Sequence, residues 1–167
     1  MKLQDKVVII TGGAGGIGAG MGRAMAKEGA IIVAVDLNAE TGAKTAAELQ
    51  QISPKSSFIQ ADLTDHKNLK NVVEEVVSKY GRLDVLVNNA HASKQVPFLE
   101  TTPEDLALSM DTGFYPTWYL MQAAIPHLKK TFARFGLHGF EICSLKRFSR
   151  GTSFGNPPSF QRRILSL

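Results

Sequence analysis

The sequence predicts an α/β protein with a doubly wound parallel sheet that is incomplete on its C-terminal side. Two patterns lead to this prediction. Four short apolar runs, each typical of a buried strand, alternate with segments whose apolar residues recur every three or four positions, as on one face of a helix. The first run leads directly into a glycine-rich stretch, Thr11–Gly18. Repeated strand–helix units require parallel strands joined by right-handed crossovers.

The first strand–helix unit predicts a site for a dinucleotide. Residues 6–11 are the expected strand and 17–28 the expected helix, with Gly12, Gly16 and Gly18 at the turn between them. Glycine permits a sharp turn with positive φ and lets bare backbone approach a pyrophosphate. The start of the helix adds unpaired N–H groups and the positive end of its dipole.

The second expected strand, residues 31–35, ends at an acidic residue. Asp36 stands 18 positions after Gly18, where a carboxylate can accept hydrogen bonds from the two ribose hydroxyls of an adenosine. A 2′-phosphate would meet this negative charge, and no Lys or Arg occupies positions 12–17 or 37–38 to offset it. The sequence therefore favours NAD over NADP.

The later elements repeat the alternation. Asp62 and Leu63 follow the third expected strand, and Asn88-Asn89-Ala90 follows the fourth. Because the carboxyl ends of parallel strands meet at one edge of a sheet, these residues should lie near the glycine loop. The remaining expected elements are a helix at 39–51, a strand at 57–61, a helix at 66–79, a strand at 83–87, and a helix at 102–128 that Gly113 and Pro116 interrupt and Pro126 kinks.

The composition is that of a soluble globular protein of one domain, with 167 residues. No apolar run approaches the length of a membrane helix, and the N-terminus has no signal-peptide pattern. The single cysteine, Cys143, excludes an internal disulfide and a multi-cysteine metal site, and we expect no metal. It fits a reducing, cytoplasmic location.

The composition changes abruptly near Lys130. Residues 1–128 hold 11 Lys or Arg and 14 Asp or Glu, whereas residues 129–167 hold eight Lys or Arg and one acidic residue. Residues 140–144 could form a short strand, and residues 146–167 have neither helical nor strand periodicity. We therefore expect a nucleotide-binding domain at 1–130 and a divergent basic tail, in loop or disorder, at 131–167.

These motifs make residues 3–130 resemble the classical short-chain dehydrogenase/reductase family. The resemblance implies a Rossmann-type fold and NAD-dependent oxidation of an alcohol or reduction of a carbonyl, on an unknown substrate. It implies that the glycine loop holds the pyrophosphate, that Asp36 selects NAD, and that Asp62 and Leu63 border the adenine. The cofactor-binding positions that it implies are Thr11, Gly12, Gly16, Ile17, Gly18, Asp36, Leu37, Asp62, Leu63, Asn88, Asn89 and Ala90.

The catalytic core of that family has no match here. The family uses a Ser followed by Tyr-x-x-x-Lys, in which the Tyr transfers the proton. The tyrosines, none of which has a Lys four positions on, are Tyr80, Tyr115 and Tyr119. Ser144 stands near the expected place of the serine with a poor local match, Met110 or Asp111 replaces an active-site Asn, and His91 replaces a glycine. We assign no catalytic residue and expect no dehydrogenase activity from this chain.

Three functions stay open at this point. The chain is the cofactor-binding part of an NAD-dependent oxidoreductase whose catalytic part is lost or replaced after Lys130, or it is a non-enzymatic NAD-binding module or regulatory partner. In either case the helix at 102–128 could pair with a second copy. The third possible function is that the basic tail binds nucleic acid by charge and stacking. An unselected, solvated tail explains the same residues, so we expect neither a nucleic acid nor a membrane partner.

Overall fold

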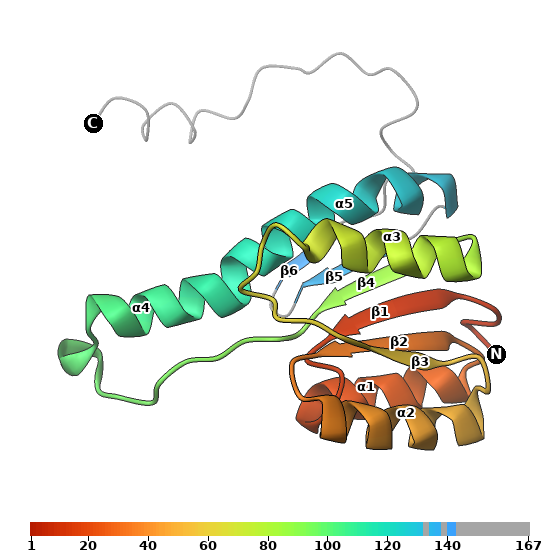
Figure 1. Ribbon diagram of the computed structural model, residues 1–167, viewed down its shortest axis with the longest axis horizontal. Coiled ribbons are helices and arrows are strands. Elements are labelled where there is room, and N and C mark those ends of the chain that lie inside the picture. Colours follow the sequence, from red (N-terminus) through yellow and green to blue (C-terminus); the bar gives the residue numbers. More distant parts are fainter. Residues whose placement is uncertain (132–133, 138–139, 143–167) are drawn as a thin grey trace, which may run out of the picture.

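A six-stranded sheet forms the centre of the fold in the computed structural model, which describes residues 1–131, 134–137 and 140–142 (Figure 1). The strand order is β3-β2-β1-β4-β5-β6. Neighbouring strands are parallel except for the antiparallel pair of β5 and β6. The strands are β1 (Val7–Thr11), β2 (Ile31–Asp36), β3 (Ser57–Gln60), β4 (Val85–Asn88), β5 (Arg134–Leu137) and β6 (Phe140–Ile142). The predicted α/β class with a doubly wound parallel sheet is confirmed.

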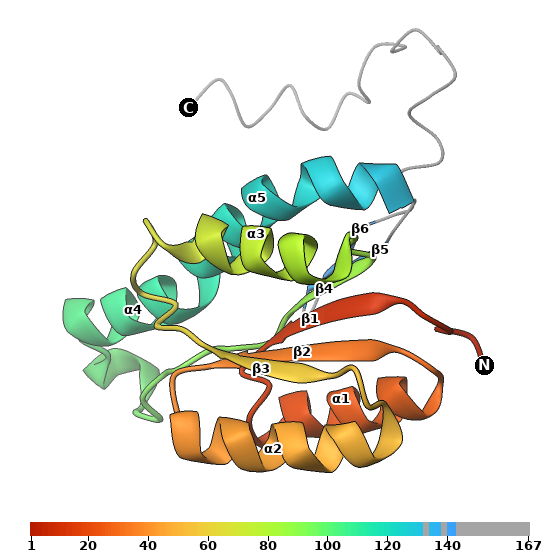
Figure 2. The same cartoon turned by 45° about the vertical axis from the view of Figure 1, so that its right-hand side comes forward.

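Helices cover the two faces of the sheet (Figures 1 and 2). One face packs against α3 and α5, with Ile9 and Leu86 among its buried strand residues, and the other packs against α1 and α2, with Ile10 and Ile32. Burial on both faces explains why the strands are continuous apolar runs. The helical elements are α1 (Gly16–Lys27), α2 (Ala39–Ile52), α3 (Leu69–Tyr80), the 3₁₀ turn η1 (Phe98–Glu100), α4 (Pro103–Ser109), the π-helical turn η2 (Met110–Phe114) and α5 (Tyr115–Thr131).

The expected interruption of the long helix is a π-helical turn rather than a break. A π-helical turn takes up an additional residue without ending the helix, and the chain continues through Gly113 and Pro116 into α5. At the start of α4, the Asp105 N–H donates to Thr102 Oγ1 and the Thr102 N–H donates to Asp105 Oδ2, which forms a capping box. Among the described residues, no helix has the length and apolar character needed to cross a membrane.

The expectation of loop after residue 130 is wrong in part. Arg134–Leu137 forms β5 and pairs in parallel with β4, so the neighbour of β4 is not the strand-like run at 140–144. Residues Phe140–Ile142 of that run form β6, which pairs with β5 instead. The pairing of β5 with β4 is a long-range contact. The four residues of β5 are too few to show a strand periodicity in the sequence, so the strand could not be predicted from them. The tail from Cys143 onwards, with Ser144, lies outside the described residues, and the domain boundary at 130 stays a prediction.

Asp84 ties the amino ends of β1 and β4 together. Its side chain is 2% exposed and accepts hydrogen bonds from the Val7 N–H at 2.9 Å, from Lys6 Nζ at 3.3 Å and from Arg82 Nε and Nη2 at 2.7 and 2.6 Å. Burial alone would raise the pKa of this carboxyl. The hydrogen bonds from Arg82, Val7 and Lys6 outweigh burial, and the pKa of Asp84 is lowered.

We expect Asp84→Asn to destabilise the fold by about 2 kcal/mol at pH 7, because Lys6 and Arg82 lose a charged acceptor. The folded-state pKa lies below the ordinary value of 3.8. The carboxylate therefore stabilises the fold fully above that value, and its contribution is lost as the pH falls through the lowered pKa. Urea denaturation at pH 7 and at pH 3 measures the free energy of unfolding of both proteins. The difference between wild type and Asp84→Asn should be smaller at pH 3 than at pH 7. An equal difference at both pH values would contradict the stabilising role of the Asp84 carboxylate.

Candidate functional site

The glycine loop turns between β1 and α1 with two left-handed residues. Gly12 has φ +63° and Gly16 has φ +50°, in the region where residues with a Cβ are strained. Gly18, in the first turn of α1, lies so close to the loop that a Cβ would stand 2.1 Å from the Gly12 carbonyl oxygen. Among the described residues no side chain caps the start of α1. Its first N–H groups are therefore available to phosphate oxygens.

Hydrogen bonds fasten the end of β4 to the same loop. Thr11 Oγ1 accepts from the N–H groups of Asn89 at 3.0 Å and Ala90 at 3.1 Å. In return Asn89 Nδ2 donates to the carbonyl oxygens of Thr11 at 3.0 Å and Gly12 at 3.3 Å. Thr11 and Asn89, two of the predicted residues, therefore shape the loop rather than simply border it.

Asp36 at the end of β2 also holds the glycine loop. Its Oδ2 accepts the Ala14 N–H at 3.1 Å, and its Oδ1 accepts the Asn38 N–H at 3.2 Å. The opposite group of Ala14, its carbonyl oxygen, accepts a hydrogen bond of 2.7 Å from the buried Thr45 hydroxyl. Thr45 is a residue that the sequence analysis missed, because a threonine on a helix has no distinguishing pattern. The carboxylate of Asp36 thus faces the loop in a fixed orientation.

Asp62 lies at the corresponding end of β3. Its Oδ1 accepts from the Thr64 hydroxyl at 2.7 Å and from the Thr64 N–H at 2.9 Å. These hydrogen bonds from the Thr64 side chain and backbone lower the pKa of the Asp62 carboxyl. The group is therefore an anion at neutral pH, and a hydrogen-bond acceptor.

A cavity of about 370 Å³ brings these strand ends together. Of the predicted positions, those that line it are Gly12, Asp36, Leu37, Asp62, Leu63, Asn89 and Ala90. Thr11, Gly16, Ile17, Gly18 and Asn88 do not line it. The cavity also includes residues that the sequence analysis did not assign to the site: Ala61, Thr64, His91, Ala92 and Thr112. Of these residues, only His91 could be noticed in the sequence, because it replaces the glycine that follows Asn-Asn-Ala in the family that the sequence resembles.

Two predicted positions have other surroundings. Ile17 is 64% exposed beside the loop, and Asn88 is 7% exposed, with its Oδ1 lacking a hydrogen-bond partner among the described residues. In the alternating pattern of β4, Asn88 lies on the same face as the buried Leu86. Asn88 is therefore a residue of the sheet, whereas Asn89 is the one that reaches the loop.

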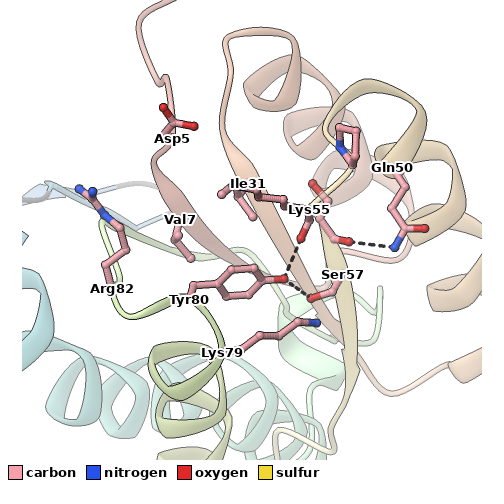
Figure 3. Close-up of a pocket in the computed structure, with 11 residues that line it drawn as sticks. Asp5, Val7, Ile31, Gln50, Lys55, Ser57, Lys79, Tyr80 and Arg82 are labelled. Carbon is pink, nitrogen blue, oxygen red and sulfur yellow. Dashed lines mark hydrogen bonds between the residues drawn. The ribbon is translucent and has the colours of Figure 1, made fainter.

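None of the three tyrosines lines this cavity. Tyr80 lines a different cavity of about 660 Å³ with Val7 and Ile31, the first residues of β1 and β2, so it stands at the opposite edge of the sheet (Figure 3). There its hydroxyl donates to the Lys55 carbonyl oxygen at 2.8 Å and lies 2.8 Å from Ser57 Oγ. Tyr115 and Tyr119 contact the His66 ring, with centroids 5.6 and 5.1 Å away.

Metal-ligating side chains do not converge in the part of the chain that the structure describes, where no three His, Cys, Asp or Glu residues could hold an ion. Met110 and Asp111, which stand where an active-site Asn was expected, belong to η2 and do not line the cavity. The site as described presents backbone N–H groups, carboxylates and one amide. It has the groups for a dinucleotide and offers no proton-transferring tyrosine.

Known proteins are similar to this chain in sequence and in fold. Residues 6–134 match the family described as short chain dehydrogenase. The 3-oxoacyl-(acyl-carrier-protein) reductase FabG of Thermotoga maritima is 34% identical over 130 residues, covering 78% of this chain and 53% of that protein. The 15-hydroxyprostaglandin dehydrogenase (NAD+) of Rattus norvegicus is 40% identical over 117 residues, covering 69% and 44%. The crystal structure of Cj0485 dehydrogenase superposes with a TM-score of 0.75 at 29% identity, covering 81% and 52%. The chain spans about half the length of these proteins.

Two glycines of α1 provide a matched test of the loop geometry. Gly18→Ala should destabilise the protein by about 1–3 kcal/mol, because its methyl group would overlap the Gly12 carbonyl oxygen. At Gly20, no atom apart from those of its chain neighbours and of the backbone of its own helix lies within 4 Å of the place that a new methyl group would take. Gly20→Ala should therefore stabilise the protein by about 0.5–1 kcal/mol through helix propensity. Chemical denaturation of both variants checks this; equal effects of the two substitutions would show that the packing of Gly18 on the loop is not what matters.

Proposed function

This chain belongs to the short-chain dehydrogenase family, and we propose that it is the NAD(H)-binding part of an oxidoreductase that acts on an alcohol or a carbonyl. The observation that carries the proposal is the convergence of the glycine loop, Asp36, Asp62 and Asn89 at one cavity on the carboxyl edge of the sheet. A relative whose name includes NAD+ supports the choice of cofactor. The single cysteine of the chain supports a reducing, cytoplasmic setting.

The residues present suit the pyrophosphate and the adenosine half of a dinucleotide. The N–H groups at the start of α1, behind Gly12 and Gly16, would hold the pyrophosphate. Asp36 would accept from the ribose hydroxyls of the adenosine, and Asp62 and Leu63 would border the adenine. When bound, the nicotinamide supplies hydride transfer. The chain's own contribution is to bind and orient the cofactor.

The preference for NAD over NADP rests on the charge at Asp36. Two backbone N–H groups fix its carboxylate beside the loop, and among the described residues no Lys or Arg lines the cavity to neutralise a 2′-phosphate. The 2′-phosphate of NADP would lie beside the negatively charged carboxylate of Asp36. This carboxylate could rotate away from the phosphate only by breaking its hydrogen bonds to the Ala14 and Asn38 N–H groups. This supports NAD as the cofactor.

Asp36→Asn removes the charge while the amide keeps an acceptor oxygen for one of the two N–H groups, and the ratio of the two affinities reports the effect of the charge because a change in the loop affects both nucleotides alike. Wild type should bind NADH at least about tenfold more tightly than NADPH, and the variant should narrow that ratio about tenfold. A like-charge contact near a protein surface is worth on the order of 1–4 kcal/mol. Fluorescence titration with both nucleotides measures the ratio, and Lys44→Gln, on the exposed side of α2, is the control. An unchanged ratio in Asp36→Asn would refute selection by charge.

We further propose that this chain does not turn over an alcohol or a carbonyl by itself. The tyrosines at positions 80, 115 and 119 do not line the cavity, and each already contacts other side chains or backbone. Purified protein of verified mass should bind NADH yet leave its absorbance at 340 nm (the NADH band) unchanged with a panel of aldehydes and ketones. Turnover above that of a Gly18→Ala control would overturn this proposal.

A non-enzymatic NAD-binding partner is the second candidate, and the exposed surface of α4 and α5 favours it. Figures 1 and 2 show α4 projecting away from the sheet. Leu106 of α4 is 59% exposed, and Trp118 of α5 is 56% exposed. Apolar surface of this kind suits pairing with another chain, and we propose a second copy as its partner. Light scattering on the sample used for the turnover assay tests this: a monomer at micromolar concentration would argue against it.

A further inference from the structure

Thr112 connects the π-helical turn to the loop that follows β4. Its Oγ1 accepts the Ala92 N–H at 2.9 Å, and its own proton lies within reach of two carbonyl oxygens, those of Leu108 at 2.7 Å and Ala92 at 3.1 Å. Both backbone groups of Ala92 thus meet one hydroxyl. Residues 89–97 have no helix or strand to hold them, so this side chain fixes the loop where it leaves the sheet.

Gly113, the next residue of η2, leaves room for the side chain of His91 from the loop after β4. A Cβ on Gly113 would stand 2.7 Å from His91 Cδ2, so the imidazole packs directly against the backbone of η2. The η2 turn therefore holds both residues of the His91–Ala92 segment, Ala92 through the Thr112 hydroxyl and His91 through contact with Gly113.

The segment held in this way is a wall of the nucleotide cavity. His91, Ala92 and Thr112 line the same cavity as Asp36 and Asp62. Those two carboxylates stand at the ends of β2 and β3, on the side of the glycine loop away from β5. The wall therefore faces the end of the cavity where the adenosine half of a dinucleotide would lie.

We propose that Thr112 is a positioning residue for the cofactor, which holds the His91–Ala92 wall against the adenosine half of the bound dinucleotide. This inference rests on the proposed binding of NAD(H). Thr112 also lines the cavity itself, but the proposed role is its hydrogen bonding to Ala92, and it takes no part in hydride or proton transfer. The π-helical turn thus has a role in binding, as such turns often have at functional sites.

The first test compares variants of Thr112 in titrations with NADH and with AMP, which contains only the adenosine half. Thr112→Val should weaken both ligands by the same factor, about three- to tenfold, the range expected for one lost hydrogen bond. Thr112→Ser should restore wild-type affinity to within about twofold, because it keeps the hydroxyl. The control is Lys94→Gln, which removes another tie of this loop, the 2.7 Å ion pair with Asp105. Neither member of that pair lines the cavity, so AMP affinity should not change.

The second test uses Gly113 and does not depend on removing a hydrogen bond. Gly113→Ala should displace the His91 ring and weaken AMP and NADH, whereas in a His91→Gly background the same substitution should have no effect on affinity. If Thr112→Val does not fold, the comparison of Gly113→Ala in wild type and in the His91→Gly background still tests whether η2 positions the His91–Ala92 wall.

The possible failures can be told apart. If wild type binds neither NADH nor AMP, the proposed function falls, and the inference with it. If wild type binds but neither Thr112→Val nor Gly113→Ala weakens binding, only the inference is overturned. If NADH is weakened while AMP is not, the wall faces the nicotinamide half, and the proposal as stated is wrong.

Discussion

The hydrogen bonds between Thr11 and the start of the loop after β4 are the interaction on which the site depends. Strands β1 and β4 are neighbours in space but not in sequence, so the chain leaves the sheet in different directions at their two ends. Such a point opens a crevice in a parallel sheet. The Thr11 hydroxyl and the Asn89 amide close its floor by joining one strand end to the other. In the folded protein the glycine loop lies directly above this floor.

Much of this could be predicted from the sequence because the relevant signals are local. Buried strands read as apolar runs, and Gly12 and Gly18 fall where a turn and a close helix approach require them. The contribution of Thr45 could not be predicted, because its hydroxyl reaches Ala14 across 31 positions, and a threonine on an amphipathic helix does not stand out. Strand β5 was missed for a related reason. Its identity as a strand comes from pairing with β4 and not from its own four residues.

The π-helical turn shows how an irregular sequence can belong to a regular element. Gly113 and Pro116 are ordinary signals for the end of a helix, and in this segment they accompany a local change in winding instead. The glycine makes room for a ring from another part of the chain, and the residue before it anchors that part. A second contact reinforces the arrangement from the other side, because His66 Nε2 lies 3.4 Å from the Asp111 carbonyl oxygen. The turn is thus held between the loops that follow β3 and β4.

The strand order has a consequence for the way in which the molecule assembles. Val8 pairs with Ile32 on one side and with Val85 on the other. The first pairing closes a short segment of chain, and the second encloses two further strands and three helices, which makes it the slower contact to form. On a growing chain, β1, β2 and β3 can associate while one edge of β1 still awaits its partner. The floor of the crevice, which needs Asn89, is therefore among the last parts of the domain to be completed.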